Sequence, residues 1–95
     1  MFIVTLRFSV NKAQAQHFME GHNAWIRRGF EDGVFVLTGS LQPSAGGAVI
    51  AHNISRDELD HRLSQDPFVA EEVVVADILE ITPGRTDERL SFLAA

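Results

Sequence analysis

Apolar side chains occupy every second position at the start of the chain. They are Phe2, Val4, Leu6, Phe8 and Val10. A repeat of two residues is the period of a β-strand, in which successive side chains point to opposite faces. The pattern therefore predicts a first strand over residues 2–10.

The repeat then changes to the spacing of an α-helix. The residues that share one helical face are Phe18, His22, Trp25, Ile26, Gly29 and Phe30. Asn11, with Gln14 three residues later, is a relative of the capping box, so we expect the helix to begin directly after Asn11. Glycine closes helices because it readily adopts the left-handed conformation, which places the end near Asp32 and Gly33.

The rest of the chain predicts a hairpin, a second helix and a last strand. Two β-branched and aromatic runs, at residues 34–40 and 46–52, are separated by a loop with Pro and Ser and predict an antiparallel hairpin. Ser55 and Glu58 form a capping box that predicts a second helix. A last β-branched run at residues 72–81 predicts the fourth strand.

The element order is thus strand, helix, strand, strand, helix, strand. Two such halves predict an α+β fold of the ferredoxin-like βαββαβ type, with a four-stranded antiparallel sheet and both helices on one face. The 95 residues make a single domain, with a core over residues 1–82 and a C-terminal tail over residues 83–95.

The predicted sheet has more apolar surface than two helices can cover. Ile3, Val73, Val74 and Val75 place apolar side chains on both faces of the first and fourth strands. A chain this small also buries only about 60 to 65% of its unfolded surface. We therefore expect a homodimer in which the uncovered sheet faces pack together.

Composition excludes several classes of function. The chain is 45% hydrophobic and 22% charged, which is typical of a globular domain, and 8 basic against 13 acidic residues give a net charge of -5, which disfavours nucleic acid. It has no cysteine, and the four histidines lack the spacing of a metal site. No export signal or membrane-spanning segment is recognisable, so we expect a cytoplasmic protein.

Topology brings two residues with suitable chemistry to one edge of the sheet. The first helix descends from the edge at which the first strand ends, and Gln65 to Phe68 return to that edge, so His22 and Asp66 converge in one cleft. An imidazole acts as a general acid or base near pH 7, and a carboxylate fixes its tautomer. The alternative is structural, with His22 a hydrogen-bonded core residue and Asp66 the start of a turn before Pro67.

The glycines near that edge also have structural alternatives. Gly39 either lets another backbone approach closely within the sheet or lends backbone amides to the cleft. Gly46 and Gly47 read as part of a hairpin rather than a phosphate-binding loop, since no helix follows them directly.

The sequence resembles the YCII-related (YciI-like) family along nearly its whole length. The matching pieces are His22–Ile26, Gly33, Leu37–Leu41, Pro43, Gly46–Gly47 and Asp66–Val69. The resemblance implies a dimeric α+β barrel and a catalytic pair formed by His22 and Asp66. Many relatives have a basic residue shortly before the histidine, which this chain lacks, and Arg7 is the residue expected to substitute for it.

The leading hypothesis is a cofactor-independent enzyme that acts on a small ring compound by proton abstraction or elimination, as the dehydrochlorinases that the family resemblance implies would do. His22 would move the proton and Asp66 would orient it. The residues expected to contact substrate are Arg7, Phe18, Trp25, Gly39, Ser40 and Phe68, with no metal. Two alternatives stay open: a non-catalytic module that binds a small ligand, and a cofactor-independent monooxygenase.

Overall fold

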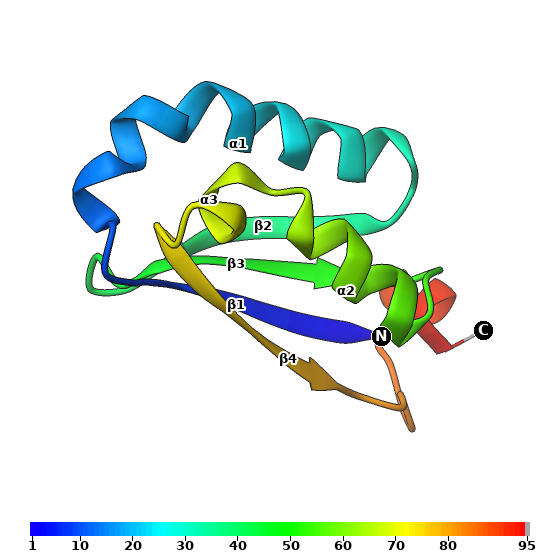
Figure 1. Ribbon diagram of the computed structural model, residues 1–95. Coiled ribbons are helices and arrows are strands. Elements are labelled where there is room, and N and C mark those ends of the chain that lie inside the picture. The colour runs from blue at the N-terminus through cyan, green and yellow to red at the C-terminus, as the bar shows by residue number, and fades with distance from the viewer. Residues whose placement is uncertain (95) are drawn as a thin grey trace.

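The computed structural model describes residues 1–94 and forms one antiparallel sheet of four strands with its main helices on one face (Figure 1). The strands are β1 (Phe2–Phe8), β2 (Phe35–Leu41), β3 (Gly46–Ala51) and β4 (Val74–Glu80). The helices are α1 (Ala15–Glu31), α2 (Arg56–Ser64) and α3 (Pro67–Ala70), and two 3-10 segments are η1 (Lys12–Gln14) and η2 (Glu88–Ala94). The strand order β2-β3-β1-β4 confirms the ferredoxin-like topology.

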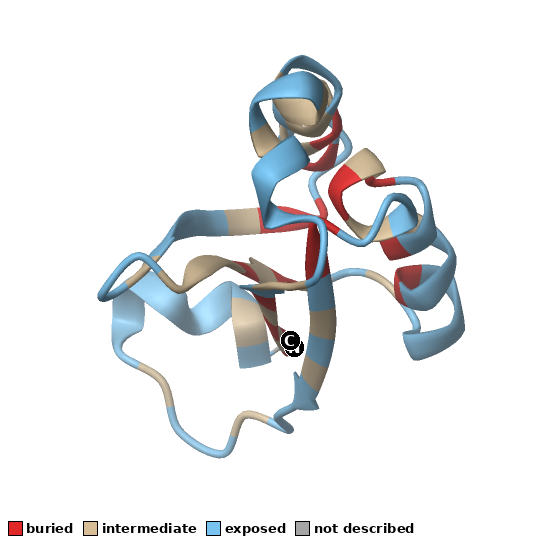
Figure 2. Ribbon diagram, turned by 60° about the vertical axis from the view of Figure 1, so that its left-hand side comes forward, coloured by how far each residue is buried: buried red, intermediate tan, exposed pale blue. Residues whose placement is uncertain are grey.

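The core lies between the sheet and the helices, where Figure 2 shows the buried segments meeting. β1 supplies every second residue to this core, namely Phe2, Val4 and Leu6, as the period of two predicts. Trp25 of α1 and Leu59 of α2 are almost fully buried above them. The face of α1 that carries Trp25 and Gly29 therefore looks at the sheet.

The predicted beginning of the first helix is wrong. Asn11 makes no capping hydrogen bond; its Nδ2 instead donates to the Glu71 carbonyl, 2.9 Å away, just before β4. A 3-10 turn follows, and α1 begins only at Ala15. The amide of Asn11 thus ties the exit of β1 to the entry of β4, a contact between residues far apart in sequence that a local capping pattern cannot reveal.

The other two helix boundaries are confirmed. Gly33 has φ of 71° and follows Asp32, the C-cap of α1, and its N–H donates to the Phe30 carbonyl at 3.0 Å. Ser55 Oγ accepts from the Glu58 amide at 3.1 Å, and the Glu58 carboxylate reaches back to the Ser55 amide. Both are local signals, so the sequence carries them directly.

The second face of the sheet has no helix over it. Cross-strand partners share a face, so the registers place Ile3, Ile50, Leu79 and Leu37 together there, with Arg7 and Val75 further along. We call this the open face. Leu37, Val75 and Leu79 are each more than half exposed on it.

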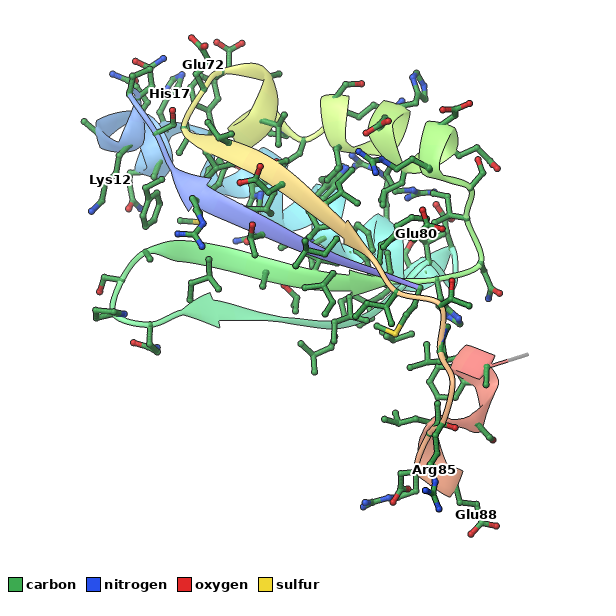
Figure 3. All side chains as sticks on the ribbon, turned by 90° about the horizontal axis from the view of Figure 1, so that it is seen from below. Lys12, His17, Glu72, Glu80, Arg85 and Glu88 are labelled. Atoms are coloured by element: carbon green, nitrogen blue, oxygen red, sulfur yellow. The ribbon has the colours of Figure 1, made fainter. Side chains whose placement is uncertain are left out.

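The tail leaves the sheet beyond β4 and lies at the end of the molecule opposite the start of α1 (Figure 3). It contacts the rest of the chain through Phe92, whose ring meets the His52 ring edge-on with centroids 5.4 Å apart. Within the tail, the Arg89 side chain and then its backbone N–H donate to Asp87 and hold the pKa of that carboxyl below its ordinary value. Across residues 1–94, none of the helices has the length and apolar character needed to cross a membrane.

Candidate active site

His22 and Asp66 meet where α1 passes the start of α3. His22 Nδ1 lies 2.9 Å from Asp66 Oδ1, although 44 residues separate the two along the chain. The Asp66 side chain is fully buried, whereas that of His22 keeps 12% of its surface exposed. A carboxylate acceptor at Nδ1 selects the tautomer with the proton on that nitrogen, which leaves Nε2 with its lone pair available.

The local sequence fixes the position of Asp66. Asp66 is the N-cap of α3, and its Oδ1 accepts from the Phe68 amide at 3.0 Å, while Pro67 occupies the first turn. Oδ1 therefore accepts from two donors, and Oδ2 is buried without a hydrogen-bond partner among the described residues. This arrangement holds the carboxylate rigidly toward the imidazole.

Gly21 is the residue that lets α3 approach α1. A Cβ atom at Gly21 would lie 3.0 Å from Pro67 Cγ, tighter than an ordinary contact. Gly21 directly precedes His22 in α1, and Pro67 directly follows Asp66 at the start of α3. The close approach of α1 and α3 at this point therefore brings His22 and Asp66 together.

We expect Gly21→Ala to disturb the pair more than the fold. The extra methyl group has to push Pro67 away by a few tenths of an ångström, while alanine favours a helix over glycine by up to about 1 kcal/mol. The free energy of unfolding in urea should therefore change by less than about 1 kcal/mol, while the ¹⁵N NMR shift of His22 Nδ1 moves. Gly84→Ala, where an added Cβ meets nothing within 4 Å, is the control. Unchanged His22 nitrogen shifts in Gly21→Ala would contradict this account.

Aromatic contacts fix the plane of the His22 ring. The ring stacks on Phe68 with centroids 3.9 Å apart and an angle of 4° between the planes, and the indole of Trp25 lies 6.0 Å away on a nearly parallel plane. With one nitrogen held by Asp66 and the ring held by Phe68, His22 has little rotational freedom.

A cleft of about 300 Å³ opens beside this ring, between α1 and the sheet. We call it the α1 cleft. Its walls are mostly apolar and come from three sides: Met19, His22, Asn23 and Ile26 of α1, Leu6 and Phe8 of β1, and Phe68 of α3. The polar side chains at its edge are those of His22, Asn23, Thr38 and Ser40. A mostly apolar cleft with few polar groups is typical of a site for a small organic molecule.

The glycines of β2 and β3 shape the other wall. Gly46 has φ of 129°, and a Cβ there would lie 2.0 Å from the Leu6 carbonyl oxygen, so only glycine fits this position. Gly39 also lines the cleft, but an added Cβ would meet nothing within 4 Å. Of the two alternatives for Gly39, a close backbone approach is therefore excluded, and Gly46 has that role.

The structure brings some of the expected site residues to the cleft and leaves others elsewhere. His22, Gly39, Ser40 and Phe68 line it, and Asp66 lies directly behind His22. Three do not line it. Trp25 is 1% exposed in the core, and its Nε1 donates to the Arg62 carbonyl at 2.9 Å. Phe18 packs beside the core with its ring edge-on to His17, and Arg7 lies on the open face.

Sequence reasoning did not find Met19, Asn23, Ile26 and Thr38 as lining residues. Residues three or four positions apart share a helical face, and this spacing relates Met19, Asn23 and Ile26 to one another and Met19 and Ile26 to His22. That spacing was the available signal that they line the same cleft. In β2, Thr38 lies two residues from Ser40 and so shares its strand face, which was the available signal that Thr38 also lines the cleft. Residues 1–94 contain no group of three or more His, Asp or Glu side chains that could hold a metal ion.

Solved structures place the fold among known proteins. The sequence itself matches no family model and no curated protein. The structure resembles that of 5-chloro-2-hydroxyhydroquinone dehydrochlorinase (TftG) from Burkholderia phenoliruptrix, which was solved in complex with 2,5-dihydroxybenzoquinone, with a TM-score of 0.70. The two share 14% sequence identity, and the match covers 88% of this chain and 96% of that one. The fold is shared.

Proposed function

We propose that this protein is a cofactor-independent enzyme that moves a proton on a small ring compound bound in the α1 cleft, with elimination as the leading reaction type. The observation that carries the proposal is the 2.9 Å contact between His22 Nδ1 and a fully buried Asp66, at the wall of an apolar cleft. The fold shared with a dehydrochlorinase supports the same reaction class.

His22 Nε2 is the atom assigned to the proton transfer. In an elimination, Nε2 accepts a proton from the bound ring, the electron pair left on the ring forms a new double bond, and a leaving group such as chloride departs with its own bonding pair. The proton then passes from Nε2 to water, so the overall change is loss of the acid. No oxidant or reductant takes part.

Asp66 is assigned to orientation and charge. It keeps the proton of neutral His22 on Nδ1, and when Nε2 gains a proton its carboxylate faces the new positive charge at 2.9 Å. General acid–base catalysis of this kind contributes about a hundredfold to ten-thousandfold in rate.

The test uses the ring compound bound by the structural neighbour. With 2,5-dihydroxybenzoquinone in heavy water, we expect the protein to accelerate exchange of ring hydrogens for deuterium, measured by proton NMR. With 5-chloro-2-hydroxyhydroquinone, we expect release of chloride. If neither reaction is faster than in buffer although both compounds bind in the α1 cleft, the site is a binding module and the proposal is wrong.

We also propose that two copies pair through the open face. Three side chains there, Leu37, Val75 and Leu79, are 52%, 51% and 59% exposed, which leaves apolar surface in water beside Thr5, Arg7 and Asp77 of the same face. A second copy presents the same surface, so a two-fold axis would bury both at once. The α1 cleft lies on the opposite side of the sheet and stays accessible in such a pair.

Leu79→Glu should break the pair. Placing an unpaired carboxylate in an apolar interface costs about 2 kcal/mol or more, which raises the dissociation constant of the dimer at least about thirtyfold. Sedimentation equilibrium at micromolar concentration measures this. Val10→Glu adds the same charge at an apolar residue that is 81% exposed outside the sheet, and it should leave the dimer intact. A wild-type protein that sediments as a monomer would contradict the pairing.

A further inference from the structure

Lys12 is the only lysine in the chain, and this exposed residue lines a hollow beside the α1 cleft. Its Nζ lies over the Phe8 ring, 4.8 Å from the centroid. Phe8 is also a wall of the α1 cleft. A second hollow of about 370 Å³, to which Lys12 contributes, shares Phe8, Ser40 and Gly46 with that cleft, so the two hollows adjoin.

The backbone around Lys12 is fixed by contacts to other elements. Lys12 N donates to the Ser9 carbonyl at 3.1 Å, and the preceding Asn11 is bound through its side chain to Glu71 and through its backbone N–H to Glu72. Figure 3 shows Lys12 at the end of the sheet where β1 leaves and α1 begins, with Glu72 at the same end. The lysine therefore starts from an anchored turn rather than from a loose loop.

Among residues 1–94, no carboxylate pairs with the charge of Lys12, whose Nζ faces the Phe8 ring instead. The second hollow is also lined by Ser40, Gln42 and Ser44. Among residues 1–94, none of these three side chains forms a hydrogen bond. A cation without an anionic partner and three exposed polar side chains thus adjoin an apolar cleft, which is the distribution expected for a ring compound with an anionic substituent.

We propose that Lys12 binds an ionised oxygen of the substrate, so that the α1 cleft selects ring compounds that carry a carboxylate or an acidic phenolate. This deepens the proposed function and rests on it for the position of the ring beside His22. The ring occupies the apolar cleft against Phe8 and Phe68, and the anionic oxygen lies toward Lys12 Nζ. The chain has a net charge of -5, which repels anions, so a cation at the cleft is the feature that would attract them.

The experiment measures binding rather than turnover. Benzoate, 4-nitrophenolate at pH 8.5 and the neutral isostere benzamide are titrated into ¹⁵N-labelled full-length protein, and Kd is obtained from the amide shifts of Thr38, Gly39 and Gly47. Lys12→Met keeps much of the side-chain length and removes the charge, whereas Lys12→Arg keeps the charge. The control is Arg85→Met, which removes one positive charge from the tail, at the far end of the molecule in Figure 3.

We expect Lys12→Met to weaken binding of the anions about tenfold, to leave benzamide within about twofold, and to be rescued by Lys12→Arg. Arg85→Met should leave all three probes unchanged. The stronger of the two anions identifies the oxygen that the site prefers. Equal loss for benzamide and benzoate, no loss in Lys12→Met, or no binding of either anion at millimolar concentration overturns the inference. Absence of turnover with intact anion binding contradicts the proposed function alone.

Discussion

His22→Gln is expected to lower the rate of deuterium exchange or chloride release at least about a hundredfold. Glutamine keeps an N–H donor that can reach Asp66, but its amide neither accepts nor releases a proton near pH 7, so the chemistry is lost and the contact kept. The measurement is the exchange rate of 2,5-dihydroxybenzoquinone under saturating conditions, together with the free energy of unfolding in urea. The free energy should change by less than about 1.5 kcal/mol, because one hydrogen bond is replaced by another.

The matched control for this variant is His17→Gln. His17 lies on the same helix, one and a half turns earlier, and is exposed at the end of the molecule seen in Figure 3. It should keep the wild-type rate. Equal rates in His22→Gln and the wild type would remove His22 from the reaction, whereas equal losses in both variants would point to a general effect of removing a histidine from α1.

Asp66→Asn exchanges one carboxylate oxygen for an NH₂ group, and near the site this change should lower the free energy of unfolding the most. The amide oxygen can replace Oδ1 as the acceptor from His22 and Phe68, but the NH₂ group then occupies the place of Oδ2, which is buried without a partner. A buried donor without an acceptor costs about 1 to 3 kcal/mol, and urea denaturation should show a loss of that size. If the amide turns the other way, its NH₂ faces the Phe68 N–H and the cap is lost, with a similar cost.

The same variant should reduce turnover at least about a hundredfold, because an amide facing Nδ1 does not stabilise the imidazolium and can reverse the tautomer. Asp32→Asn is the control. Asp32 is 54% exposed and pairs with Arg62 at 3.0 Å, and such a surface pair is worth at most about 1 kcal/mol. If Asp66→Asn is as stable and as active as Asp32→Asn, the carboxylate has neither role.

The sequence predicted those parts of the fold that depend on local patterns. The alternation of Phe2, Val4 and Leu6, the capping box at Ser55 and the helix end at Gly33 each involve residues within a few positions of one another. The predicted start of α1 was wrong for the opposite reason. Asn11 bonds to the Glu71 carbonyl, 60 residues away, and a capping pattern contains no information on that partner.

The candidate site shows the same division. His22 and Asp66 were brought together by topology, because two elements that reach one edge of a sheet in a known order have few ways to be arranged. The walls of the cleft depend on side-chain direction, which the order of elements does not fix. Trp25 therefore turned out to be core, Arg7 faces the open side of the sheet, and Lys12, which follows the mispredicted cap, was overlooked.

The most direct test of the account is ¹⁵N NMR of the histidine rings during titration with 2,5-dihydroxybenzoquinone. The four histidines are His17, His22, His52 and His61, and of these only His22 lines the α1 cleft. We predict that free His22 has its proton on Nδ1, and that its Nε2 signal shifts on binding while the other three rings stay unchanged. A His22 protonated on Nε2 alone, or one whose Nε2 is unmoved when the ligand is bound, would contradict the proton-transfer site described here.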